Sequence, residues 1–483
     1  MDDNNSPQTV IQLREYQSVI LKRLKKNFDR KIHCIAEVDT GLGKRVLTYL
    51  LIKEILPTHR VLLLLHSTTS YLETIHYFEK EYGGFKGSEF QSFSSRTPTW
   101  LRKRIITEAR IVASTPQTFA NVFEKIPLNR PKFDAVIINE VDKIVRRQGD
   151  SRLLVFPYNT LIPYFVQDAW IVGMTGTLRD SHIFYDRQQD QIKIRDEKIT
   201  LDRRIPDLEI ISMDELMAET DVDSYIQYTQ IKKDLVQPSE ALRTILEYID
   251  EAIKGLREAI LEEQKAENPT LLEMIPISQL ALVSGMLEAN DTQKYNGLLL
   301  TRKYAVSMQV DKYKKFLYRL KKFGIEKQMI HAIPKTNAKV KRILQLLAER
   351  SVSSKTVVLC SYLDTAHLLV EKVRAKGFTP FLVTGEVREK AEVLNAFKSH
   401  STKRGNTILI MTGVGERDID IPQADLLIVY DVVNTVKTMY QRMKRTRGGT
   451  VLTLCYRDTF EEKKVDRLLS EIAKRYPWSS IIE

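Results

Sequence analysis

A glycine-rich turn between an apolar run and a helical pattern constrains this 483-residue chain more than any other feature. The segment 38–45, VDTGLGKR, follows the apolar run Ile32–Ala36 and precedes the helical pattern Val46–Ile55. A strand, a turn and a helix start in that order form a phosphate cradle, because backbone N–H groups close on phosphate oxygens and the helix N-terminus adds a positive dipole end. We expect Lys44 to reach the β- and γ-phosphates of a nucleotide. The next residue should carry a hydroxyl for Mg²⁺, but it is Arg45.

Composition is typical of an intracellular globular protein. Hydrophobic residues make up 43% and charged residues 28% of the sequence. No apolar run reaches the roughly 18 residues that a bilayer span needs, and the N-terminus lacks the pattern of a signal peptide. The three cysteines (Cys34, Cys360 and Cys455) lie far apart beside apolar runs, so we expect buried, reduced thiols rather than a zinc site. We expect a cytoplasmic or nucleoid-associated protein that does not contact a membrane.

The net charge of +12 favours a polyanionic partner, because a basic surface gains affinity by releasing counterions from nucleic acid. A generally basic proteome would give the same balance. The charge does not distinguish DNA from RNA.

Short apolar runs alternate with helical patterns in two parts of the chain, which predicts an α/β fold with parallel sheets covered on both faces. The predicted strands are Ile32–Ala36, Val61–His66, Arg110–Ala113, Ala135–Ile138 and Trp170–Met174, then Thr356–Cys360, Thr379–Val383, Thr407–Met411, Leu426–Tyr430 and Thr450–Cys455. Residues 213–330 contain no convincing strand and have charged residues at helical spacing. We expect three parts: an α/β domain over 1–205, a helical insert over 206–335 and a second α/β domain over 336–483.

A second motif lies downstream of the phosphate loop, where the apolar strand of the segment 133–142 ends in amide and acidic groups. In P-loop enzymes this place supplies an Asp that holds Mg²⁺, and often an adjacent Glu that activates the attacking water. The first acid is replaced by Asn139, while Glu140 is retained. Alone, such a pattern is most often structural. Downstream of Lys44 it predicts a catalytic carboxylate at Glu140 and a degenerate metal position at Asn139.

Further short motifs follow one another in an ordered set. They are Leu13–Gln17, Ser114–Thr118, Thr175–Thr177, Ser361–Ala366, Thr412–Gly413, Arg417–Pro422 and Gln441–Gly448. In this order and spacing the chain resembles superfamily 2 helicases, above all the archaeal Hef and Fanconi-anaemia group M branch. The resemblance covers nearly the whole chain and implies two tandem RecA-like P-loop domains with an all-helical insert between them. We expect no nuclease domain of the kind some relatives carry, because the sequence stops soon after the second motor domain.

The resemblance also implies roles for individual residues. Gln17 would read the adenine, and Glu140 would be the catalytic carboxylate. The implied nucleotide-binding residues are Gln17, Thr40, Gly41, Gly43, Lys44, Arg45, Asp420 and Arg442, and the implied catalytic residues are Lys44, Glu140, Gln441 and Arg445. The residues implied to couple the cleft or to touch the nucleic-acid backbone are Ser114, Thr115, Thr175, Thr177, Ser361 and Thr412.

Three departures from the family pattern fall on the chemistry. Arg45 and Asn139 replace both protein anchors of the metal, and Gly448 stands where the family has a second arginine, with Arg447 shifted by one place. An arginine aimed at the transferring phosphoryl group is worth ~10³–10⁵ in rate. We therefore expect impaired ATP hydrolysis. ATP or ADP would bind with Arg45 as a fixed cation in place of Mg²⁺. The sequence does not decide whether Mg²⁺ binds as well.

The helical insert carries a basic and aromatic segment over residues 311–323. At helical spacing Tyr313, Phe316, Leu317 and Leu320 form one apolar stripe, which favours a place in the core. The basic residues off that stripe are Lys314, Lys315, Arg319, Lys321 and Lys322. They form either a solvated face or a set of phosphate contacts.

Two functions remain open. The first is a helicase-like DNA-binding protein with degraded catalysis, a pseudo-helicase, acting on branched, single-stranded or repair-intermediate DNA. It would act alone or with an intact helicase or nuclease partner. The second is an active ATP-dependent DNA helicase or translocase with unusual motifs. A metabolic P-loop kinase is disfavoured, because it would not need a second α/β half carrying Gln441 to Arg445.

Overall fold

A computed structural model describes most of the chain. The described residues are 11–39, 41–85, 87–126, 131–145, 157–176, 178, 182–186, 191–226, 228–263, 289–319, 326–349, 354–387, 389–400, 407–413, 424–432, 436–444, 449–477 and 480–482. The chain forms two compact units. One comprises Met1–Asp180 with Asp196–Ile226, and the other Ser181–Arg195 with Gln227–Glu483.

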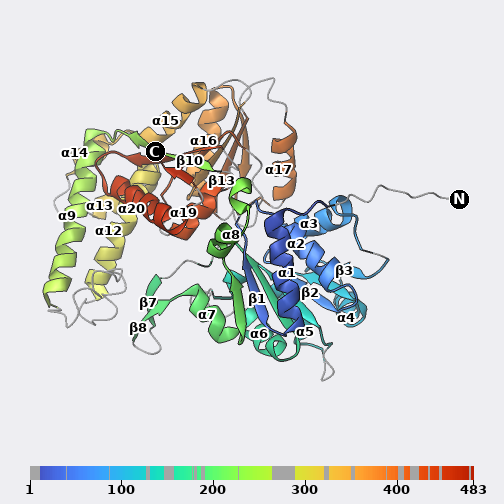
Figure 1. Ribbon diagram of the computed structural model, residues 1–483. Coiled ribbons are helices and arrows are strands. Elements are labelled where there is room, and N and C mark those ends of the chain that lie inside the picture. The colour runs from blue at the N-terminus through green and yellow to red at the C-terminus, as the bar shows by residue number, and fades with distance from the viewer. Residues whose placement is uncertain are drawn as a thin grey trace. The chain divides into compact units, whose positions relative to one another are not determined.

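A seven-stranded parallel sheet forms the centre of the first unit, in the order β3-β4-β2-β5-β6-β1-β9 (Figure 1). Its strands are β1 (His33–Glu37), β2 (Val61–Leu64), β3 (Phe90–Ser92), β4 (Ile111–Ser114), β5 (Ala135–Asn139), β6 (Trp170–Thr175) and β9 (Leu208–Ile211). Its helices are α1 (Glu15–Asp29), α2 (Lys44–Leu50), α3 (Thr68–His76), α4 (Thr99–Glu108), α5 (Pro116–Phe123), α6 (Pro157–Asp168), α7 (Glu197–Arg204) and α8 (Met213–Glu219). The central strands are buried, as expected for a parallel sheet covered on both faces.

The second unit is built on another seven-stranded parallel sheet, in the order β12-β13-β11-β14-β15-β10-β16. Its strands are β10 (Thr229–Val236), β11 (Lys355–Cys360), β12 (Thr379–Val383), β13 (Thr407–Thr412), β14 (Leu426–Val429), β15 (Thr450–Tyr456) and β16 (Ser480–Ile482). The helices that follow its strands are α16 (Leu363–Ala375), α17 (Lys390–Ser399), α19 (Val436–Met443) and α20 (Phe460–Arg475). A separate antiparallel hairpin pairs β7 (His182–Asp186) with β8 (Gln191–Arg195).

The ten strands predicted from the sequence are all present, and the expected α/β class is confirmed. The predicted domain limits need correction at two places. The first sheet continues past residue 205, because β9 pairs with β1. The prediction of no strand over 213–330 was wrong, because β10 lies there and pairs with β15 and β16.

The helical insert shares a core with the second sheet. It comprises α9 (Glu240–Glu263), α12 (Ala289–Ser307), α13 (Val310–Arg319) and α14 (Lys327–Ala332), and α15 (Ala338–Ala348) follows it at the start of the predicted second α/β domain. Figure 1 shows α9 and α12 side by side. One hydrophobic cluster contains residues of these helices, such as Ile249 and Tyr313, together with Val358 and Leu454 of the sheet. The insert therefore packs as part of the second unit rather than as a third body.

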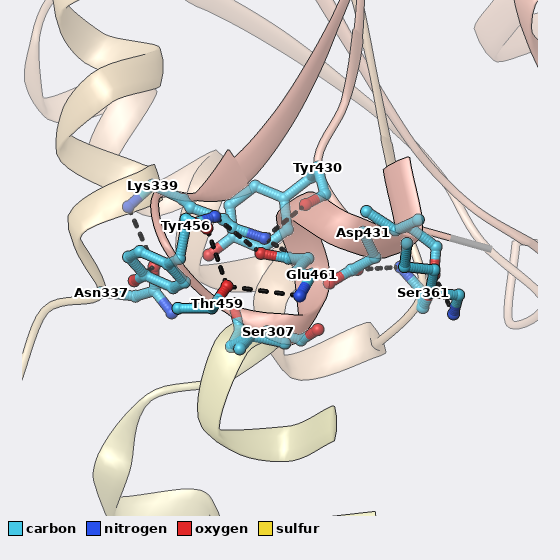
Figure 2. A network of polar contacts seen from close by, with 12 residues as sticks. Ser307, Asn337, Lys339, Ser361, Tyr430, Asp431, Tyr456, Thr459 and Glu461 are labelled. Atoms are coloured by element: carbon cyan, nitrogen blue, oxygen red, sulfur yellow. Dashed lines mark hydrogen bonds and ion pairs between the residues drawn. The ribbon is translucent and has the colours of Figure 1, made fainter. Parts of the chain in front are cut away.

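A buried polar network joins α15 to the second sheet (Figure 2). The Lys339 ammonium, on α15, donates to Glu461 Oε1 at 2.5 Å and to Tyr430 O at 3.1 Å. Both charged side chains are almost fully buried, at 0% and 2% exposed. Tyr456 donates its backbone N–H to Glu461 Oε2 and its hydroxyl to Asn337 Oδ1. Because a buried charge needs a close partner, this pair holds α15, β15 and α20 in register.

The three cysteines, Cys34, Cys360 and Cys455, are buried thiols, as expected. Burial raises the pKa of Cys34 and Cys455 to about 12, so both stay protonated at neutral pH. Among the described residues, no helix combines the length and the apolar character needed to cross a bilayer.

Candidate nucleotide and nucleic-acid site

The phosphate loop joins β1 to α2, and its two glycines have left-handed backbone conformations. Gly41 has φ +90° and Gly43 has φ +83°. Side chains are strained at such angles. A Cβ at Gly43 would also lie 2.6 Å from Gln17 Nε2. Because Gly43 is the N-cap of α2, the loop turns into the helix directly before Lys44.

Lys44 and Glu140 face each other at the carboxyl end of the first sheet. The Lys44 ammonium lies 3.6 Å from Glu140 Oε1 and donates to Val38 O at 3.3 Å. Glu140 directly follows β5 and has φ +56°, an uncommon angle for a residue with a side chain. Such strained residues gather at functional sites. Two of the predicted catalytic residues are thus brought together.

The positions that would anchor a metal, Arg45 and Asn139, have other partners. Arg45 forms an ion pair with Glu73 of α3, and its guanidinium carbon lies 4.9 Å from the ring centre of Tyr77. In this conformation the Glu73 carboxylate holds and neutralises the Arg45 guanidinium, and a role for Arg45 as a fixed cation in place of Mg²⁺ stays a prediction. The Asn139 amide donates to Ser70 Oγ at 3.4 Å, and Asn139 Oδ1 is buried without a hydrogen-bond partner.

The start of α1 lies against the phosphate loop. Gln17, 5% exposed, donates through Nε2 to Leu42 O and accepts through Oε1 from the Arg14 backbone N–H. The Tyr16 hydroxyl also donates to Leu42 O, at 2.8 Å. The Gln17 amide therefore supports the loop that holds phosphate, and adenine recognition by Gln17 stays a prediction.

Three predicted nucleic-acid residues lie at strand ends of the first unit. Ser114 is fully buried, and its hydroxyl donates to Phe93 O at 3.0 Å. Its hydroxyl therefore holds the loop after β3 in place, and a role for Ser114 in coupling the cleft or contacting the nucleic-acid backbone stays a prediction. Thr175 is also buried and donates to Asp142 Oδ1 at 3.2 Å, which links two of the predicted motifs of the first unit. Thr115 is partly exposed at the N-cap of α5.

The predicted residues of the second unit are only partly described. Ser361 donates its backbone N–H to Asp431 Oδ2 at 2.6 Å, and Thr412 is buried at the end of β13. Arg442 is 5% exposed and donates to Asp431 O at 3.3 Å, so its guanidinium is turned into the unit. Gln441 lies on α19, but its side chain is outside the described part. Thr40 and Thr177 of the first unit and Asp420, Arg445, Arg447 and Gly448 of the second lie outside the described residues.

The apolar stripe predicted for the insert is confirmed where it is described, because Tyr313 and Leu317 are buried in α13. Lys314 lies off the stripe, with its ammonium 5.9 Å from the ring centre of Tyr318. The side chains of Lys315, Phe316 and Arg319, and the whole of Leu320, Lys321 and Lys322, lie outside the described part. Nucleic-acid contact by the basic residues stays a prediction.

Sequence reasoning missed three side chains of this site. Ser70 and Glu73 come from α3, and no spacing rule connects them with Arg45 or Asn139. Tyr158 of α6 is fully buried near Asp142 and Glu140. Burial, reinforced by these two charges, raises its pKa well above the usual range. The partners of the metal positions were therefore visible only in three dimensions.

The residues present fit a nucleotide phosphate better than a metal. Two left-handed glycines, the start of α2 and the Lys44 ammonium together form an anion cradle. At the metal positions one anchor is an amide and the other is an arginine already paired with a carboxylate. In the described part of the chain, no group of three or more His, Cys, Asp or Glu side chains is arranged to hold a metal.

Two domain families match the chain where the two sheets lie. Residues 10–180 match the type III restriction enzyme res subunit family, and residues 338–449 match the helicase conserved C-terminal domain family. The fold is similar to the helicase domain of Pyrococcus furiosus Hef, with a TM-score of 0.59 at 18% identity over 94% of this chain and 98% of that one. These matches and the two parallel sheets show the fold of tandem RecA-like domains, with a helicase C-terminal type domain in the second unit.

Curated relatives carry helicase names. A Methanocaldococcus jannaschii protein named as an ATP-dependent RNA helicase is 24% identical over 94% of this chain and 59% of its own length. An ATP-dependent RNA helicase of Lodderomyces elongisporus is 28% identical over 26% of this chain and 32% of its own length. The chain thus spans three fifths or less of these two relatives.

Proposed function

We propose that this chain is a helicase-like, DNA-binding protein of the Hef and Fanconi-anaemia group M type. It binds ATP or ADP in the phosphate loop but hydrolyses ATP poorly. It acts on branched, single-stranded or repair-intermediate DNA, alone or beside an intact helicase or nuclease. Its parts are a first motor domain, an insert and a second motor domain, with the limits of the first sheet moved to include β9.

The ion pair between Arg45 and Glu73 carries the proposal. An active P-loop needs a hydroxyl at this position for Mg²⁺ and a carboxylate at the position of Asn139. An arginine held by a carboxylate fills the first place, and an amide fills the second. The phosphate cradle and the Lys44–Glu140 pair are retained. Nucleotide binding is therefore kept, while Mg²⁺-dependent hydrolysis is impaired.

The decisive experiment compares nucleotide binding with and without Mg²⁺, together with ATP turnover under saturating single-stranded or branched DNA. We expect chelation of Mg²⁺ to change nucleotide affinity by less than about threefold, which is below ~1 kcal/mol. We also expect DNA not to raise turnover. Brisk, Mg²⁺-dependent and DNA-stimulated turnover would contradict the proposal and support an active helicase or translocase, the function that Lys44 and Glu140 favour.

The choice of DNA rests on the resemblance to the Hef branch. The names of the two curated relatives favour RNA instead. Matched DNA and RNA strands of one sequence, compared at one salt concentration, separate the two. Tighter binding of the RNA strand would replace DNA by RNA in the proposal.

A further inference from the structure

Trp100, on the first turn of α4, is 65% exposed, the largest exposed fraction among the large apolar side chains in the described part of the chain. The other two tryptophans differ: Trp170 is 5% exposed, and the side chain of Trp478 is not described. Exposing a large aromatic ring to water is unfavourable. One exposed apolar side chain is common on a protein surface, so the position of Trp100 and its charged neighbours decide whether it binds anything.

Topology places Trp100 at the edge of the first sheet that carries the motifs. β3 runs parallel to β4, and α4 begins seven residues after β3 ends at Ser92. The start of α4 therefore lies at the carboxyl end of the strands, where Thr115 follows β4. The Phe93 N–H donates to Ala113 O, and Phe93 O accepts from the Ser114 hydroxyl. The loop that leads to Trp100 is thus tied to the predicted nucleic-acid motif.

The loop between β3 and α4 is held in one shape. The partly exposed Arg102 guanidinium donates to Thr97 O and Ser95 O, at 2.5 and 2.6 Å. Inside the loop, the Ser94 N–H donates to Thr97 Oγ1 and the Thr97 N–H donates to Ser94 O. The ring and the neighbouring charges are therefore carried on a preorganised segment, which lowers the entropy lost on binding.

The charges around Trp100 are positive. Arg96 and Lys103 are exposed, and Lys103 shares a helix face with Trp100 because it lies three residues further on. Arg104 is paired with Glu108, the one acidic residue between positions 93 and 109. An aromatic ring flanked by basic side chains matches a base and its adjacent phosphates, whereas a neutral protein partner would leave these charges unpaired.

We propose that Trp100 is a stacking platform for a base of a single-stranded nucleic acid, and that Arg96 and Lys103 contact the flanking phosphates. Trp100, Arg96 and Lys103 form one surface. A nucleic-acid strand bound there would run past Thr115 towards the β3 edge of the first sheet. The inference rests on the proposed nucleic-acid function and assigns it a specific contact.

The test uses the full chain and a fluorescently labelled single-stranded oligothymidylate. Trp100→Leu should weaken binding about tenfold, within the range of one lost base stack, and should leave the salt dependence unchanged. Trp100→Phe keeps an aromatic face and should stay within about threefold of the parent. Lys103→Gln should reduce the slope of log affinity against log salt by about the amount that one phosphate contact contributes.

Tyr228→Leu is the matched control, because Tyr228 is another exposed aromatic, at 46%. We expect the control to bind as the parent does. Equal thermal unfolding midpoints of the parent and Trp100→Leu would show that folding is not the cause.

Unchanged binding by Trp100→Leu would overturn the stacking platform while leaving nucleic-acid binding in place. Equal losses for Trp100→Leu and Trp100→Phe would also overturn it, because a stack tolerates another aromatic ring. A parent that binds no single-stranded or branched nucleic acid would overturn the proposed function itself, and the platform with it.

Discussion

At the scale of the residue, the Arg45 guanidinium lies between a carboxylate and an aromatic ring of the segment that follows β2. Glu73 neutralises it, and Tyr77 covers it. Arg45 and Asn139 together remove the hydroxyl and the carboxylate that would bind Mg²⁺. The proposed loss of metal dependence is therefore a property of two side chains, and it should respond to their substitution.

The double variant Arg45→Thr with Asn139→Asp restores both missing ligand types. We expect Mg²⁺ to strengthen its nucleotide binding about tenfold, which corresponds to ~1.4 kcal/mol. Each single variant should show a smaller effect. Calorimetric titration of a nucleotide with and without Mg²⁺ measures the difference. A double variant as insensitive to Mg²⁺ as the parent would show that something other than these side chains decides metal binding.

Gly43 is the residue where the loop has least freedom. Gly43→Ala should destabilise the first unit by about 1–3 kcal/mol, because a Cβ is strained at this φ and meets the Gln17 amide. Gly41→Ala is the control, since it has a similar φ but open space around it. Chemical denaturation compares the two. If both variants lose the same stability, the contact with Gln17 has no effect.

The phosphate loop and its lysine were predictable from the sequence, because glycines next to a helix start have few other uses. Glu73 was not predictable, since it lies 28 residues from Arg45 and no local pattern marks it. At Ser114 the sequence marked the motif but not the direction of the side chain, which points inward and donates to Phe93 O. Motifs mark positions along the chain, and they do not tell which way a hydroxyl turns.

At the scale of the element, the buried Lys339–Glu461 pair ties α15 to α20 of the second unit. Lys339→Met should lower the free energy of unfolding by about 3–5 kcal/mol, because it leaves Glu461 buried without its partner. Adding Glu461→Gln should restore much of the loss, since no unpaired charge remains. Denaturation of both variants gives the values.

Lys372→Met is the control for a surface pair, because Lys372 contacts Glu371 with both side chains exposed. It should change stability by less than about 0.5 kcal/mol. A loss for Lys339→Met no larger than this would mean that the network does not hold α15 in place.

Of the six described strands that the sequence analysis missed, three illustrate two physical reasons. β10 carries Lys232, Lys233 and Asp234 and is buried at only part of its length, so it lacks the apolar run that marks the central strands. β3 and β16 are three residues long, too short to show a period. The ten strands found from the sequence are longer or fully apolar, which is why their limits were nearly right.

At the scale of the whole molecule, the net charge of +12 predicts a strong effect of salt on nucleic-acid binding. Affinity for a single strand should fall by more than about tenfold between 50 and 200 mM salt, as the release of counterions from about three or more phosphates requires. Fluorescence anisotropy across this range tests it. Affinity that salt leaves unchanged would mean that contacts other than charge dominate.

The position of β10 in the second sheet decides where an expression fragment of the second unit can begin. This strand precedes the insert in the chain, yet it lies between β15 and β16, which come last. An expression fragment begun near residue 338, where the helicase C-terminal domain match starts, would leave β15 with an open side and β16 with no neighbour. Unpaired strand edges of this kind promote aggregation, so a fragment meant to stay in solution should start before Thr229.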